Sequence, residues 1–153
     1  MKLLNRTILL VEDSQDDVFF MNRACKKALV TNPINVAQDG QEAIDYLSGE
    51  GKFKDRKQFE LPAVVLLDLK LPHKNGLEVL QWIRSRPQFK TLIVVLLTSS
   101  RENRDVEAAY KLGANAFLVK PSHFDHLVEM LKAFKVFWID QNEFPDSINS
   151  SET

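Results

Sequence analysis

The chain has 153 residues, with 27% charged residues and a formal net charge of −1. This balance gives no general electrostatic reason to bind nucleic acid or an anionic membrane. No run approaches the roughly 20 apolar residues that cross a bilayer, and the N-terminus lacks a signal-peptide layout. The one cysteine, Cys25, excludes an internal disulfide and fits a reducing compartment. We therefore expect one domain in the cytoplasm.

Short apolar runs alternate with segments of helical periodicity along the chain. Strands are expected at residues 7–11, 35–38, 63–67, 92–97 and 116–119, with the second near a sheet edge. Helices are expected after Ser14, after Gly40, after Gly76, around Tyr110 and from about residue 122 to 140. This alternation predicts an α/β fold: a doubly wound, five-stranded parallel sheet with five helices in a single domain.

The spacing of apolar residues indicates which side of each helix faces the sheet. In the first helix this side is expected to include Cys25 and Leu29, so Cys25 is a small buried hydrophobe rather than a nucleophile. In the last helix the expected core stripe ends with Phe134 and Trp138. The stretch from residue 48 to 61 has no clear period, and we expect a solvated connection there.

Charged or hydroxyl side chains follow four of the strand-like runs: Glu12, Asp13, Asp68, Thr98 and Lys120. Ligands of open parallel sheets bind beyond the carboxyl ends of the strands, which share one edge, so these groups should converge. Three carboxylates repel one another unless a cation compensates, and Mg²⁺ prefers carboxylates, waters and phosphate oxygens. A hydroxyl donor (Thr98) and a lysine (Lys120) beside them suit a phosphoryl group.

These residue types predict a specific reaction. Asp68 would be the nucleophile that attacks phosphorus and forms an aspartyl phosphate. Glu12 and Asp13 would hold Mg²⁺ together with Asp68 and the backbone carbonyl of Lys70. A single acid at a strand end is more often merely solvated, so the prediction depends on the combination.

Four segments together resemble the receiver domains of two-component response regulators: residues 8–14, 66–72 with Gly76, 97–99 and 119–121. The resemblance implies a flavodoxin-like receiver domain over residues 4–141, followed by a polar C-terminal tail over residues 142–153. It also implies that a sensor histidine kinase transfers a phosphoryl group from a phosphohistidine to Asp68. Glu12 and Asp13 would be the acidic metal pair and Lys120 the phosphate-pairing lysine. The Lys120–Pro121 bond is expected to be cis.

The resemblance further implies a conformational switch. Thr98 would move toward the phosphoryl group, and Phe117 would turn into the space that Thr98 leaves. The alternative for Phe117 is a plain core phenylalanine. Lys70 and Ser100, two residues after Asp68 and Thr98, would border the phosphoryl group and affect its lifetime.

The last helix carries more apolar side chains than one core stripe needs, and exposed aromatic and methionine patches often mark interfaces. With the 48–61 stretch, this helix resembles the small regulators that partner phytochromes. That resemblance implies a phytochrome as a candidate kinase and a homodimer formed through Met130, Phe134, Phe137 and Trp138. The alternative is that these side chains pack under the tail.

The leading hypothesis is a stand-alone response regulator, not a metabolic enzyme, that signals through protein contacts without binding nucleic acid or membrane. One alternative is a Mg²⁺-dependent phosphohydrolase with an aspartyl phosphate. Such an enzyme typically needs a second acid two residues after the nucleophile, where this chain has Lys70. The other is a phosphorylation-independent scaffold, which would be expected to lack one of the site residues.

Overall fold

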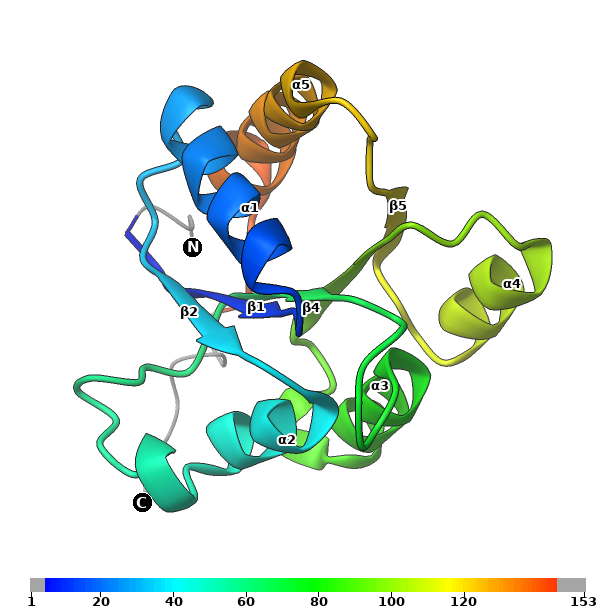
Figure 1. Ribbon diagram of the computed structural model, residues 1–153. Coiled ribbons are helices and arrows are strands. Elements are labelled where there is room, and N and C mark those ends of the chain that lie inside the picture. Colours follow the sequence, from blue (N-terminus) through cyan, green and yellow to red (C-terminus); the bar gives the residue numbers. More distant parts are fainter. Residues whose placement is uncertain (1–4, 146–153) are drawn as a thin grey trace.

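The computed structural model describes residues 5–145 (Figure 1). Its strands are β1 (Ile8–Val11), β2 (Ile34–Ala37), β3 (Val64–Leu67), β4 (Ile93–Thr98) and β5 (Ala116–Val119). Its α-helices are α1 (Gln15–Lys27), α2 (Gly40–Ser48), α3 (Gly76–Ser85), α4 (Asn103–Lys111) and α5 (Phe124–Phe134). Shorter helical segments are the 3₁₀ turns η1 (Gly51–Phe53) and η2 (Pro87–Phe89) and the π-helix η3 (Lys135–Gln141). The predicted alternation of strands and helices is confirmed.

The five strands are parallel and lie in the order β2-β1-β3-β4-β5, so β2 is an edge strand as predicted. Helices α1 and α5 cover one face of the sheet, and α2, α3 and α4 cover the other (Figure 1). Val11 pairs with Leu67 at the ends of β1 and β3, and Leu67 pairs with Leu96 in β4. The residues that follow β1 and β3 therefore leave the sheet side by side.

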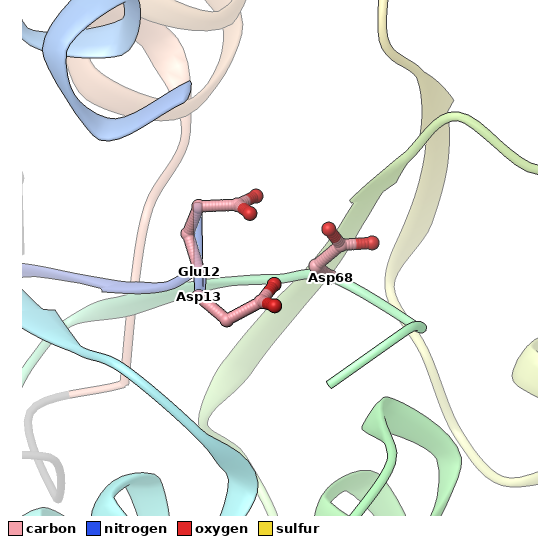
Figure 2. Close-up of side chains that lie close together, drawn as sticks. All are labelled: Glu12, Asp13 and Asp68. Carbon is pink, nitrogen blue, oxygen red and sulfur yellow. The ribbon is translucent and has the colours of Figure 1, made fainter. Parts of the chain in front are cut away.

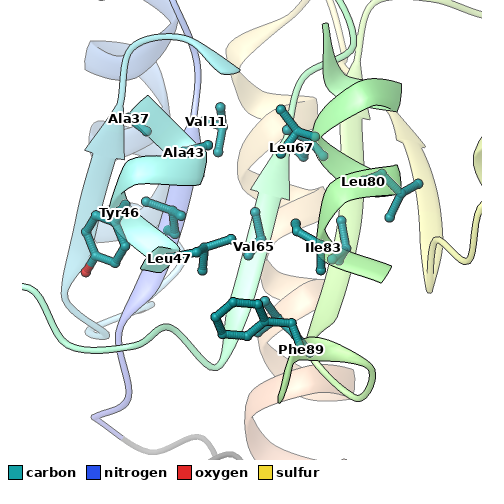
Figure 3. Packing of buried hydrophobic residues seen from close by; sticks show 14 of the residues in the cluster. Val11, Ala37, Ala43, Tyr46, Leu47, Val65, Leu67, Leu80, Ile83 and Phe89 are labelled. Atoms are coloured by element: carbon teal, nitrogen blue, oxygen red, sulfur yellow. The ribbon is translucent and has the colours of Figure 1, made fainter. Parts of the chain in front are cut away.

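Both faces of the sheet are buried. In β3, Val64 and Leu66 belong to the cluster under α1 and α5, whereas Val65 and Leu67 belong to the cluster under α2 and α3. Figure 3 shows Val65 and Leu67 packed among side chains of the second cluster, including Ile83 of α3. Burial on both faces explains why the strands read as continuous apolar runs rather than alternating ones.

The first helix ends earlier than its apolar spacing predicts. The Val30 N–H donates to the Cys25 carbonyl and the Leu29 N–H donates to the Lys26 carbonyl, which together form a Schellman motif. Leu29 has a left-handed φ of 62° and its side chain is exposed, so its expected core position is wrong. Cys25 is buried, as expected.

The last helix changes its pitch after Phe134. The ion pair between Lys135 and Asp140, at 2.9 Å, joins residues five apart, which matches the i→i+5 spacing of a π-helix. Because the wider turn shifts the register, Ile139 is 2% exposed and belongs to the core cluster. Trp138, expected in the core stripe, is only partly buried. The prediction of one regular helix to residue 140 is wrong in this respect.

Two segments that were expected to be solvated contribute to the core. Phe53 in η1 lies in the stretch expected to be solvated, and Phe144 after η3 lies in the predicted polar tail, yet both are buried. Arg56 fixes the 48–61 stretch, because its guanidinium donates to the carbonyls of Tyr46 and Leu47 at 2.7 and 2.8 Å. Residues 146–153 of the predicted tail lie outside the described residues. Among the described residues, no helix is long and apolar enough to cross a membrane.

Candidate functional site

Three carboxylates meet at the ends of β1 and β3. One oxygen each of Glu12, Asp13 and Asp68 lies within 4.8 Å of the others, and Figure 2 shows Glu12 and Asp13 extending toward the Asp68 side. Glu12 is 4% exposed and Asp68 is 9% exposed, whereas Asp13 faces solvent. The predicted convergence of these acids is confirmed. Their oxygens form a donor set that suits a hard divalent cation.

Lys120 brings a positive charge into this cluster. Its Nζ donates to Glu12 Oε2 at 2.5 Å, to Asp68 Oδ2 at 3.0 Å and to Asp17 Oδ2 at 3.2 Å. The backbone explains its position, because the Lys120 N–H donates to the Thr98 carbonyl at 2.8 Å and aligns the end of β5 with that of β4. The resting site therefore compensates its buried carboxylates with an ammonium group.

Asp17 is a site residue that the sequence analysis missed. It lies in the first turn of α1, where its backbone N–H donates to the Ser14 side chain that caps the helix. The spacing of Ser14 and Asp17 is that of a helix cap, which accounts for Asp17 without any further role. Only the folded structure shows that the start of α1 lies beside Lys120.

Burial and charge shift two pKa values in the cluster. Burial raises the pKa of Glu12, against the opposing effect of its bond with Lys120. For Lys120, burial alone lowers the pKa, but the bond to Glu12 and the charges of Asp68 and Glu12 raise it above its ordinary value. Lys120 is therefore protonated at neutral pH in this site.

Asp68 is oriented by its own backbone and by α3. Its Oδ1 accepts from the Leu69 N–H at 2.7 Å, while Oδ2 faces Lys120. The Gly76 N–H donates to the Leu69 carbonyl at 2.8 Å. A Cβ on Gly76 would lie 2.1 Å from the Asp68 carbonyl oxygen, so only glycine lets α3 begin this close to the strand end.

The remaining predicted residues surround this centre. Thr98 is fully buried, and Ser100 donates from Oγ to Asp105 Oδ2 at 2.5 Å. Phe117 is partly buried and packs against the cluster under α2 and α3. Lys70 is exposed on the loop after β3.

The Lys120–Pro121 bond is trans, and no cis bond occurs among residues 5–145. The cis expectation is therefore wrong in this structure. An X–Pro bond favours trans by about 0.5–1 kcal/mol, and with a trans bond Lys120 already reaches the carboxylates of Glu12, Asp17 and Asp68.

A cavity of about 450 Å³ opens beside the carboxylates, between α1 and α5. Asp17, Glu12, Asp68 and Lys120 line it together with apolar side chains such as Leu66. The side chains of the cluster therefore have room to exchange partners.

The response regulator receiver domain model matches residues 8–132. The chain belongs to this family. It is 34% identical to response regulator Rcp1 of Synechocystis sp. over 140 residues, which are 92% of this chain and 93% of Rcp1. This receiver domain therefore belongs to two-component signalling and is related to phytochrome-partner regulators, as the sequence predicts.

Solved structures agree with this assignment. The phosphorylated cyanobacterial phytochrome response regulator RcpA has a TM-score of 0.84 at 33% identity, covering 92% of this chain and 99% of RcpA. The bacteriophytochrome response regulator AtBRR has a TM-score of 0.72 at 46% identity, covering 90% of this chain and 98% of AtBRR. A Mn²⁺-bound form of Rcp1 is also similar, with a TM-score of 0.81. A relative with this fold thus holds a divalent metal, for which Glu12, Asp13 and Asp68 offer oxygen donors here.

Proposed function

We propose that this receiver domain accepts a phosphoryl group on Asp68 from a phosphohistidine of a sensor histidine kinase, in a Mg²⁺-dependent reaction. The observation that carries the proposal is the group of three carboxylates with Lys120 only 3.0 Å from Asp68. The similarity to Rcp1, RcpA and AtBRR makes a phytochrome the first class of kinase to test.

Asp68 is arranged for attack through one oxygen. Because the Leu69 N–H holds Oδ1, Oδ2 forms the new bond to phosphorus. The N–P bond of the phosphohistidine breaks, and its electron pair stays on the imidazole ring. Lys120 supplies positive charge to the phosphoryl oxygens, where charge is concentrated during transfer.

Mg²⁺ would be held by Glu12, Asp13, Asp68 and the backbone carbonyl of Lys70. When bound, it neutralises charge on the carboxylates and on the phosphoryl oxygens. The fit rests on the donor set, because hard carboxylate oxygens are what Mg²⁺ prefers.

Phosphorylation would be sensed at β4 and β5. Thr98 donates to a phosphoryl oxygen, and Phe117 turns toward the space that Thr98 leaves. Phe117 has no hydroxyl group to form a hydrogen bond, so the coupling depends on packing alone. Lys70 and Ser100 control the access of water and thereby the phosphoryl lifetime.

The signal leaves through protein contacts in the cytoplasm, without direct binding to nucleic acid. We place a homodimer surface at the end of α5 and in η3, with Met130, Phe137 and Trp138. Phe137 is 57% exposed, which supports this surface. Phe134, predicted as a fourth interface residue, is buried in the core of the single chain, so we leave it out of this surface.

Transfer of ³²P from an autophosphorylated bacteriophytochrome kinase tests the function. We expect wild type to be labelled only when Mg²⁺ is present, and we expect hydroxylamine to release the label, as it does from an acyl phosphate. Asp68→Asn should not be labelled. Asp55→Asn, on the exposed 48–61 stretch, is the matched control and should be labelled like wild type. Equal labelling of Asp68→Asn, or none of wild type, would refute the proposal.

Sedimentation velocity tests the dimer. Wild type with Mg²⁺ and beryllofluoride should sediment as a dimer, and Phe137→Ser should shift it toward the monomer. Tyr110→Ser removes a similarly exposed aromatic from α4 and should leave the dimer intact. A dimer that resists Phe137→Ser would place the interface elsewhere.

A further inference from the structure

Asp17 differs from the other acids that contact Lys120. It bonds to the same ammonium as Glu12 and Asp68 but is not one of the three carboxylates grouped for a metal. Its side chain is 48% exposed, whereas that of Glu12 is 4% exposed. Lys120 thus has one carboxylate partner outside the metal cluster.

The resting contacts of Lys120 conflict with metal binding. Its ammonium occupies Glu12 Oε2 and Asp68 Oδ2, two oxygens of carboxylates that a divalent cation would need. Two cations held by the same carboxylates repel each other strongly where burial lowers the effective dielectric constant. A bound metal therefore displaces Lys120 from one or both of these carboxylates.

A displaced Lys120 still needs a partner, because its side chain is only 18% exposed and a partly buried unpaired charge is costly. Asp17 is already within bonding distance at 3.2 Å, and both residues line the same cavity. Its position is fixed by the cap, because the Ser14 Oγ accepts from the Asp17 N–H and the Ser14 N–H donates to Glu12 Oε1.

We propose that Asp17 is a positioning residue that receives the Lys120 ammonium when a divalent cation occupies the carboxylates of Glu12, Asp13 and Asp68. The inference rests on the metal site of the proposed function. Asp17 lowers the cost of moving Lys120 and so increases the affinity for Mg²⁺ without touching the metal. It also keeps Lys120 next to Asp68, ready for the incoming phosphoryl group.

Isothermal titration calorimetry with Mg²⁺ on the unphosphorylated full chain tests this role. Asp17→Asn should weaken Mg²⁺ binding by about five- to tenfold, as expected for one lost charge-assisted hydrogen bond that is partly screened by solvent at the half-exposed Asp17. Asp17→Glu should restore binding to within about twofold of wild type. The matched control is Asp16→Asn in the same turn of α1, where the described structure shows no bond to Lys120, and its effect should stay below about twofold.

A double-mutant cycle separates this role from simple attraction between Asp17 and the metal. In the Lys120→Met background, Asp17→Asn should no longer change Mg²⁺ affinity, because there is no ammonium to receive. An equal loss in both backgrounds would mean that Asp17 acts on the metal through its charge, and the inference would be overturned. Lys120→Gln serves the same cycle if Lys120→Met fails to fold, and circular dichroism checks each variant.

The outcomes separate this inference from the proposed function. Wild type that binds no Mg²⁺ would refute the metal site on which both depend. Wild type that binds Mg²⁺ and transfers phosphoryl groups, with Asp17→Asn binding as tightly, would refute only the role of Asp17.

Discussion

Lys120→Met removes the one cation that contacts the buried carboxylates of Glu12 and Asp68 within the described residues. Breaking a buried ion pair by removing one partner costs about 3–5 kcal/mol, because the other charge stays buried without compensation. The Lys120 side chain is 18% exposed and lines an open cavity, so solvent screens part of this cost. We therefore expect the variant to lose about 2–3 kcal/mol of unfolding free energy in EDTA.

Mg²⁺ should reverse this loss. A ligand that binds only the folded state stabilises it by about 2.7 kcal/mol at a hundredfold excess over its dissociation constant. The increase should be larger in Lys120→Met than in wild type, because no ammonium has to leave the carboxylates. Urea unfolding in EDTA and in excess Mg²⁺ measures both effects. The reasoning that Lys120 compensates the cluster would be refuted if Lys120→Met were as stable as wild type in EDTA. It would also be refuted if Mg²⁺ stabilised Lys120→Met less than wild type.

Four other substitutions test the packing of the fold. Ile139→Ala should lower the free energy of unfolding by about 2–4 kcal/mol, measured by urea unfolding, and Trp138→Ala should lower it by less than half as much. A larger loss in Trp138→Ala than in Ile139→Ala would mean that the segment has an α-helical register. Gly76→Ala should displace the Asp68 backbone, lower the free energy of unfolding by about 2 kcal/mol or more and slow phosphoryl transfer. Unchanged transfer would contradict the close approach of Gly76 to the Asp68 carbonyl oxygen. Burial raises the pKa of the Cys25 thiol from 9.0 to about 11, so unfolding free energy should fall as pH rises from 9 to 11, because the unfolded thiol ionises first. Cys25→Ala should show a smaller fall over the same pH range.

The strands and the acidic cluster could be predicted because two simple rules decide them. Burial on both faces requires continuous apolar runs, and parallel strands in register end at one edge. Once Val11 pairs with Leu67, the residues after them must be neighbours, so the meeting of Glu12 and Asp68 follows from the order of the strands. The position of Lys120 follows in the same way from the end of β5 beside β4.

Other features depend on packing that periodicity does not encode. A period of 3.6 residues places Trp138 four positions after Phe134, but the π-helix adds a residue to the turn and buries Ile139 instead. Leu29 fits the helical spacing, yet the Schellman motif turns it outward. Asp17 carries no sequence signal beyond that of a helix cap, because its contact with Lys120 spans 103 positions of the chain.

Lys120 connects the carboxylate cluster at the ends of β1 and β3 to the layer formed by α1 and α5. Its partner Asp17 is the third residue of α1, and four residues after Lys120 the chain enters α5. Any change in the partners of Lys120 therefore acts on both helices, which pack against each other. Phe117 lies on the opposite face of the sheet and packs against the cluster under α2 and α3. The two layers are thus expected to respond to the phosphoryl group through separate contacts, one ionic and one through packing. A metal alone, by displacing Lys120, would act on the first layer before Thr98 and Phe117 move.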